Sequence, residues 1–187
     1  WTPCFPSQFG CDQNVTEYPY NPERAKELLA EAGYPDGFTT EFYAYRDRDY
    51  AEAIASYLNA VGIKIDFKML QYSALRELNM KGEVPMSFQT WGSYSINDAS
   101  AMVSQFFKHG SLDMTRDDQT LEWLDVADQS NDPEKRKEYY TKALKRIADE
   151  AYWAPMFSYN TNYVTNQDVE YTPTADEVLR FTTMNWK

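Results

Sequence analysis

The stretch YPYNPERAKELLAEAGYPDGF, residues 18–38, decides the fold, because it contains both ends of a helix and the turn that follows. Asn21 can cap the first free backbone N–H groups of a helix, and Pro22 fits the first helical position. Gly33 supplies the left-handed residue at which such a helix ends. Between these signals, apolar residues recur at helical spacing: Ala25, Leu28, Leu29 and Ala32.

The chain continues as alternating strands and helices. Asp36-Gly37 is typical of a turn, after which residues 39–45 are predicted to form a strand. Residues 49–61 are amphipathic at helical spacing, and residues 63–70 alternate as a second strand does. A strand, helix and strand within about thirty residues predict a parallel, right-handed βαβ unit.

The rest of the chain extends this pattern. A third helix and a third strand make the order β-α-β-α-β and favour the α/β class. The second half is more helical, and two late strands follow it. The predicted helices are 73–80, 98–108, 118–127 and 132–150, and the predicted strands are 86–91, 153–159 and 163–165. The tail from Asp176 to Lys187 has no clear local partner.

Composition narrows the class of function. The chain has 187 residues, 43% hydrophobic and 25% charged, which suits one folded domain with a core. A net charge of −11 disfavours nucleic acid and anionic membrane surfaces as partners. No run approaches the roughly 20 apolar residues of a membrane span. Because Trp1 is not an initiator residue, we expect a processed or excised piece whose signal peptide is not in this chain.

The two cysteines lie in one short loop, CFPSQFGC. Such a pair, Cys4 and Cys11, is typical of a local disulfide in an oxidising compartment, although two free thiols are the alternative. Two cysteines and a distant His109 do not make a metal site. The sequence contains neither a P-loop nor a dinucleotide G-x-G-x-x-G motif, so no cofactor is expected.

Signals for catalysis are weak, and no catalytic residue is predicted. A Ser/His/Asp set would depend on the single histidine, and no serine lies in a G-x-S-x-G motif. A glycoside hydrolase with paired carboxylates stays open as an alternative. Its candidate pairs are Asp47/Asp49, Asp117/Asp118 and Asp125/Asp128.

The sequence WGSYSIND, residues 91–98, follows the third predicted strand and precedes a helix. In open α/β sheets, ligands bind outside the carboxyl ends of the strands. The alternative is that Trp91 belongs to the core and Asp98 only caps the helix. We expect this segment to line a ligand cleft through five side chains: Trp91, Ser93, Tyr94, Asn97 and Asp98.

Arg46 stands at the same end of the first predicted strand. Its guanidinium group could bind a ligand carboxylate through two hydrogen bonds. The alternative is a surface ion pair with Asp47 or Asp49. Three basic residues at 135–137 are expected on the solvated face of their helix.

Residues 18–38 resemble a segment of the peptide/nickel-type extracellular solute-binding proteins, which capture ligands for bacterial ABC importers. The resemblance lies in the motif Tyr-x-Tyr-Asn-Pro-Glu-x-Ala-Lys-x-Leu-Leu-x-x-Ala-Gly-Tyr-Pro-x-Gly-Phe. The passages at 51–67, 91–98 and 132–159 resemble the same family. In the last of these, the family's Asp-x-x-x-Arg-x-x-x-Tyr helix and Pro-containing strand correspond to Asp132, Arg136, Tyr140 and Pro155.

The resemblance implies one lobe of a two-lobed receptor without catalytic activity, an α/β lobe with a central mixed sheet flanked by helices. The connector would be 1–17, the C-terminal lobe 18–175, and the tail 176–187 would return toward an N-terminal lobe that is not in this chain. A peptide or other small solute would bind between the lobes and pass to ABC permease subunits, in the periplasm or at the extracellular face of the bacterial inner membrane. A pure interaction domain, with an aromatic face that contacts another protein, is the remaining alternative.

The resemblance also bears on the ligand. In dipeptide-binding members, an acidic residue three positions after the strand Trp binds the peptide amino group, and Tyr94 stands there in this chain. Arg46 roughly matches the Arg that binds the carboxylate. The change at Tyr94 argues against free dipeptides and favours a polyol, an oligosaccharide, an opine-like conjugate or a longer peptide held by its backbone.

Overall fold

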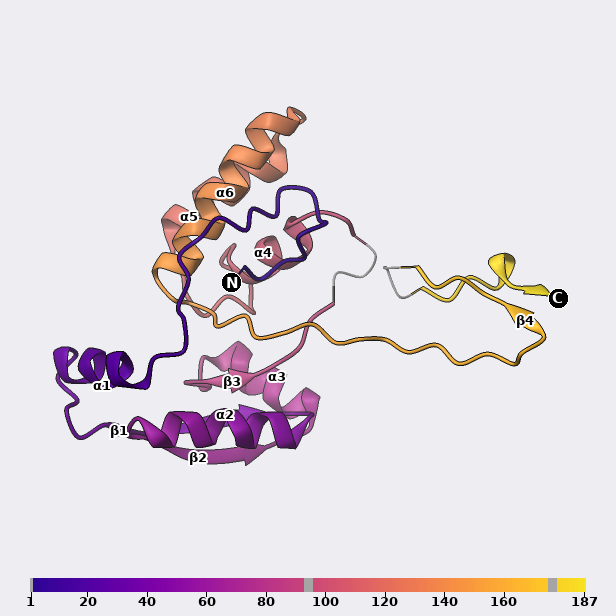
Figure 1. Cartoon of the computed structure of the whole chain (residues 1–187). Helices are drawn as coiled ribbons and strands as arrows, with labels where there is room; N and C mark the ends of the chain where they lie inside the picture. The colour runs from indigo at the N-terminus through magenta and orange to yellow at the C-terminus, as the bar shows by residue number, and fades with distance from the viewer. Residues whose placement is uncertain (1, 93–95, 175–177) are drawn as a thin grey trace. The chain divides into compact units, whose positions relative to one another are not determined.

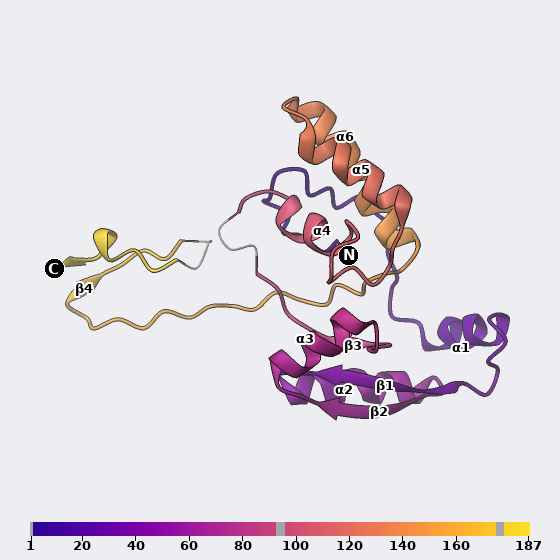
Figure 2. The same cartoon turned by 180° about the vertical axis from the view of Figure 1, so that it is seen from behind.

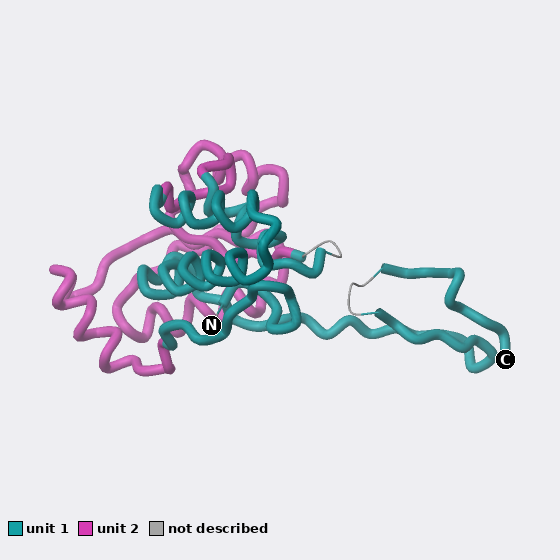
Figure 3. Tube along the Cα trace, turned by 90° about the horizontal axis from the view of Figure 1, so that it is seen from above, with its two compact units in different colours: residues 1–17, 92–108, 117–187 teal, residues 18–91, 109–116 magenta. Residues whose placement is uncertain are grey.

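The computed structural model describes residues 2–92, 96–174 and 178–187. These residues form two compact units. Unit 1 comprises residues 1–17, 92–108 and 117–187, and unit 2 comprises residues 18–91 and 109–116 (Figure 3).

Helix α1 of unit 2 (Pro22–Glu31) begins and ends as the sequence predicts. The side chain of Asn21 accepts a hydrogen bond from a backbone N–H of the first turn. Gly33 has a φ of 89°, and the N–H of Tyr34 donates to the carbonyl of Leu29 at 2.8 Å. This 6→1 hydrogen bond is that of a Schellman motif, so the glycine stop is confirmed.

The sheet of unit 2 has three strands in the order β2-β1-β3, and both pairings are parallel. Figures 1 and 2 show α2 against one face of this sheet. The predicted βαβ units and the α/β class are therefore confirmed. The elements are β1 (Phe38–Ala44), α2 (Arg48–Ala60), β2 (Ile63–Met69), α3 (Tyr72–Lys81) and β3 (Ser87–Phe88). The core between helix and sheet comprises Phe42, Ala44, Ala51, Ala55 and Phe88.

Strand β3 is shorter than the predicted strand at 86–91. Phe88 pairs with Ala44, the last residue of β1, so the chain beyond Phe88 has no ladder to extend. The sheet of unit 2 is also wholly parallel, as the βαβ pattern predicts, and not mixed, as the resemblance implied. The antiparallel pairing of the structure lies in a separate two-stranded ribbon.

Two glycines meet where β1 and β2 begin. Gly37 precedes β1 and has a φ of 74°, and Gly62 precedes β2. A Cβ atom added at Gly37 would lie 1.9 Å from the carbonyl oxygen of Gly62. The strands can therefore start side by side only because a glycine stands at position 37.

Unit 1 is built on helices α4 (Ser100–Phe106), α5 (Asp118–Gln129) and α6 (Pro133–Asp149). Helices α5 and α6 lie side by side (Figures 1 and 2). The Asp132 side chain caps α6 by accepting from the N–H of Glu134 at 3.0 Å, so the predicted helix start is confirmed. The core comprises Ala99, Val103, Phe107, Leu124, Ala127, Tyr140, Ala143, Leu144 and Ile147.

The predicted late strands at 153–159 and 163–165 are wrong. The described residues there pair with no ladder, and the ring of Trp153 instead packs on Phe106 and Phe107, with centroids 4.7 and 5.2 Å apart. An aromatic residue that packs on a helix produces the same apolar signal as an inward-facing strand residue, which explains the error.

The chain end does have a local partner, contrary to the prediction. Strand β4 (Val169–Glu170) pairs antiparallel with β5 (Asn185–Trp186), and the short helix η1 (Phe181–Thr183) precedes β5. Two-residue strands carry too little alternation to be recognised in a sequence.

Candidate functional site

The predicted binding segment, residues 91–98, belongs to both units. Trp91 and Arg46 belong to unit 2, in its stretch 18–91. Asn97 and Asp98 belong to unit 1. Ser93 and Tyr94 lie outside the described residues. The grouping of these six side chains into one site therefore stays a prediction.

In unit 2, the chain ends of β1 and β3 are tied together just before the binding segment. The Tyr45 hydroxyl and the Thr90 hydroxyl are hydrogen-bonded at 2.6 Å. Tyr45 directly follows β1 and Thr90 lies two residues beyond β3, its parallel neighbour, at the edge where ligands of open α/β sheets collect. The sequence did not predict this pair, although both residues lie at the carboxyl ends of predicted strands, 39–45 and 86–91, which was a usable signal.

Arg46 makes the ion pair that the sequence left open. Its Nε atom lies 2.7 Å from Oδ2 of Asp47, which has a left-handed backbone with φ of 48° before α2. The Arg46 side chain is 48% exposed, so this pair sits at the surface and contributes little to stability.

In unit 1, Asp98 binds two groups within the fold. Its side chain accepts from the N–H of Ser100 at 3.0 Å and from Nη2 of Arg136 at 2.8 Å. Burial alone raises the pKa of the Asp98 carboxyl, but the hydrogen bonds from Ser100 and Arg136 outweigh it and lower the pKa. Asp98 is thus an ionised residue that fixes the start of α4.

Arg136 is not on a solvated face, contrary to the prediction. Its guanidinium group contacts Asp98 and also donates to the Tyr140 hydroxyl at 2.8 Å and to the Ala127 carbonyl at 3.1 Å. It lies 4.9 Å from the centroid of the Phe9 ring. These partners come from distant parts of the sequence, so local periodicity could not reveal them.

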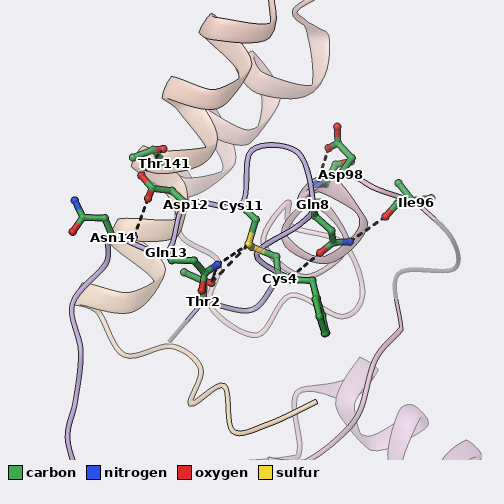
Figure 4. The surroundings of a disulfide bond; sticks show 12 residues. Thr2, Cys4, Gln8, Cys11, Asp12, Gln13, Asn14, Ile96, Asp98 and Thr141 are labelled. Carbon is green, nitrogen blue, oxygen red and sulfur yellow. Dashed lines mark hydrogen bonds between the residues drawn. A yellow bond between two sulfur atoms is a disulfide. The ribbon is translucent and has the colours of Figure 1, made fainter. Parts of the chain in front are cut away.

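Cys4 and Cys11 form a disulfide with an S–S distance of 2.02 Å. The disulfide loop, residues 4–11, lies beside the carboxyl end of the binding segment (Figure 4). The side-chain amide of Gln8 donates to the carbonyl of Ile96 at 3.0 Å. The loop is therefore in direct contact with the segment that the sequence singles out.

Asp125 and Asp128 form one of the carboxylate pairs considered for glycoside hydrolysis. Both contact Nζ of Lys108, at 2.7 and 2.8 Å. Asp128 also accepts from the Tyr140 hydroxyl at 2.8 Å. Their shared lysine gives these carboxylates a role in holding the chain just beyond α4 to α5.

Asp117 belongs to a second candidate pair and is bound from three sides. Its carboxylate accepts from Nε of Arg146 and from the hydroxyls of Tyr152 and Thr120, at 2.5, 2.9 and 3.0 Å. Burial alone raises the pKa of Asp117, but the hydrogen bonds from Arg146, Tyr152 and Thr120 outweigh it and lower the pKa to about 2. The group therefore stays ionised and neutralises Arg146.

We expect Asp117 to stabilise the fold by about 2 kcal/mol above pH 4, and this contribution to vanish as the pH falls from about 4 to about 2. The sign follows because the folded pKa lies below the unfolded one, so protonation favours the unfolded chain. The measurement is the free energy of unfolding in urea, compared between the native chain and Asp117→Asn at pH 7, 3 and 2. Asp118→Asn changes the charge equally at an exposed neighbour and serves as the control. An effect of Asp117→Asn that is equal at pH 7 and pH 2 would contradict the assignment.

Two other features, a metal-binding cluster and a helix that could cross a membrane, are absent from the residues that the structure describes. Over residues 2–92, 96–174 and 178–187, no three His, Cys, Asp or Glu side chains come together in a way that could hold a metal ion. Of the helices in this part of the chain, none combines the length and the apolar composition that crossing a bilayer requires.

Comparison with known proteins gives one consistent result. The profile of a family described as bacterial extracellular solute-binding proteins, family 5 Middle, matches residues 1–114. The glutathione-binding protein GsiB of Salmonella choleraesuis (strain SC-B67) is 28% identical over 167 residues, which cover 81% of this chain and 32% of the relative. The heme-binding protein A of Haemophilus influenzae is 26% identical, and the match covers 82% of this chain and 30% of that relative.

A solved structure shows the same likeness. The periplasmic binding protein DppA from Helicobacter pylori, in complex with the peptide STSA, is 26% identical and superposes with a TM-score of 0.73. The match covers 80% of this chain and 31% of that one. The chain thus spans about a third of the length of the relatives that it matches.

Proposed function

The chain belongs to family 5 of the bacterial extracellular solute-binding proteins, and on this premise we propose that it is part of the substrate-binding component of an ABC importer. It captures a peptide or another small polar solute, which passes to permease subunits in the membrane. Binding takes place outside the inner membrane and involves no catalysis. Residues 18–175 supply the C-terminal lobe, 1–17 connect it to an N-terminal lobe, and 176–187 return toward that lobe.

The observation that carries this proposal is the extent of the family match, residues 1–114, which contains the whole binding segment. The local geometry supports it. The Tyr45–Thr90 hydrogen bond holds together the strand ends that precede the segment, and Asp98 at its other end is bound by Arg136. A residue that is already held within the fold takes part in ligand binding at a smaller entropic cost than a free one does.

The chemistry of the segment indicates the class of solute. Ser93, Tyr94 and Asn97 offer hydroxyl and amide groups, and Trp91 offers a flat apolar surface. Such groups suit a neutral polyol, an oligosaccharide, an opine-like conjugate or a peptide held by its backbone. The named relatives bind glutathione, heme or a peptide, which shows how widely ligands differ among similar chains.

A thermal-shift screen on the two-lobed protein that the proposal requires tests this function. The probes are glutathione, the tetrapeptide Ser-Thr-Ser-Ala, a trisaccharide and an opine-type conjugate. A ligand at 100 times its Kd stabilises the folded protein by about 2.7 kcal/mol, so a matching probe raises the melting temperature by several degrees. We expect Trp91→Ala and Tyr94→Ala each to abolish this shift.

Tyr20→Ala is the matched control for that screen, because Tyr20 is 77% exposed and lies outside the binding segment. It should leave the shift unchanged. The isolated chain should bind the same probe at least about tenfold more weakly, since a closed cleft needs both lobes. A shift that survives both Trp91→Ala and Tyr94→Ala would place the ligand elsewhere. No shift with any probe in a folded protein would favour the interaction-domain alternative.

A further inference from the structure

We propose that the disulfide loop is a positioning element for the carboxyl end of the binding segment, residues 96–98, and that it acts through Gln8 and the backbone of Phe9. The importance of this contact for ligand binding rests on the proposed function. The contact itself, and its dependence on the Cys4–Cys11 bond, can be tested without a ligand. The disulfide loop and residues 96–98 both belong to unit 1.

The Gln8 side chain links the loop to the segment. Its Oε1 accepts from the N–H of Phe5 at 2.8 Å, and its Nε2 donates to the Ile96 carbonyl at 3.0 Å (Figure 4). Gln8 is only 8% exposed, so both ends of its amide are used in a largely buried setting. The loop backbone thereby orients the amide, and the amide orients the segment.

The backbone of Phe9 holds the next residues. Its N–H donates to the Asn97 carbonyl at 3.2 Å, and its carbonyl accepts from the N–H of Ala99 at 2.9 Å. Phe9 and Asp98 thus form a parallel β-bridge. Together with Gln8, the loop binds three carbonyl or amide groups within four consecutive residues, which fixes the direction of the chain there.

The disulfide maintains the shape that these contacts need. Gly10 has a φ of 75°, and a Cβ atom added there would lie 2.5 Å from the Tyr140 ring, so the loop is seated closely against α6. A short loop without a helix of its own has many open conformations, and closing it with a covalent bond removes most of them. The Cys4–Cys11 bond therefore keeps Gln8 and Phe9 in reach of the segment.

Gln13 provides a matched comparison on the other side of the same disulfide. Its Nε2 donates to the Thr2 hydroxyl at 2.6 Å and to Sγ of Cys11 at 3.0 Å. Gln8→Glu and Gln13→Glu make the same chemical change. Only the first replaces the donor to Ile96 by an oxygen that repels the carbonyl.

Amide hydrogen exchange on the 187-residue chain tests the proposal. We expect Gln8→Glu to speed the exchange of the Phe9 and Ala99 amides at least about fivefold, whereas Gln13→Glu leaves them within about twofold. The amides of Leu124 and Ile147 in the helical core report global opening and should not change. Two further conditions, the double variant Cys4→Ser/Cys11→Ser and reduction by dithiothreitol, should reproduce the local increase. Dithiothreitol supplies the two electrons and two protons and closes to its own cyclic disulfide.

Two results would overturn the proposal. One is an Ala99 amide that exchanges at the native rate in Gln8→Glu and in the reduced chain. The other is loss of the whole unit: the exchange rates of the Ala99, Leu124 and Ile147 amides rise together, or Gln8→Glu fails to fold. In either case the loop would stabilise unit 1 as a whole. A negative ligand screen would overturn the proposed function and leave this exchange result intact.

Discussion

Gly37→Ala is expected to destabilise unit 2 by more than about 3 kcal/mol, enough to unfold a domain of ordinary stability. A left-handed backbone at alanine costs about 1–2 kcal/mol. The new methyl group would also lie 1.9 Å from the carbonyl oxygen of Gly62 and 2.5 Å from its carbonyl carbon. Because both are backbone atoms at the start of β2, relief requires the two strands to separate. The loss is measured by urea unfolding followed by circular dichroism.

Gly33→Ala separates the two causes. Gly33 also has a positive φ, 89°, but no atom lies within 4 Å of an added Cβ. This control should show the backbone cost alone, about 1–2 kcal/mol. Equal losses in Gly33→Ala and Gly37→Ala would mean that the close approach of β1 and β2 carries no energetic weight.

Tyr140→Ala should destabilise unit 1 by about 3–5 kcal/mol. Tyr140 is fully buried at the centre of the core. Its ring supports Gly10, and its hydroxyl accepts from Arg136 and donates to Asp128, each at 2.8 Å. Burial and the neighbouring Asp128 raise the pKa of Tyr140, so the hydroxyl keeps its proton at every ordinary pH. Removal leaves a cavity and two charged groups that lack one partner each.

Tyr140→Phe divides this loss into packing and hydrogen bonding. It keeps the ring and should cost about 1.5–3 kcal/mol, the range for hydrogen bonds to charged groups. Calorimetric melting of both variants gives the comparison. If Tyr140→Phe is as unstable as Tyr140→Ala, the polar network and not the packed ring holds the core.

Local signals predicted the elements well. The bounds of α1 follow from Asn21, Pro22 and Gly33, and those of α6 from Asp132 and Pro133, because caps act on residues one to three positions away. The parallel order β2-β1-β3 follows from short crossovers. The prediction of the late strands failed, because alternation of apolar residues cannot distinguish a strand in a β-ladder from a segment whose Trp153 ring packs on a helix.

The candidate site was predicted only in part, for a different physical reason. Position after a strand identifies residues 91–98 as a segment, but not what holds it. The contacts Gln8–Ile96 and Arg136–Asp98 join residues 88 and 38 positions apart. Such pairs depend on tertiary packing, which helix and strand periodicity do not report.

The discontinuous make-up of unit 1 imposes an order on its assembly during synthesis. Unit 2 is nearly complete once residue 91 has left the ribosome, because residues 18–91 are contiguous. Unit 1 must wait for α6, since Asp12 is bound by the Thr141 hydroxyl at 3.0 Å and Thr16 by Asp149. Asp12 and Thr16, although made before unit 2, thus reach their native partners only after α6 has been made, and the nascent chain carries a folded βαβ layer while the helical unit is still unformed.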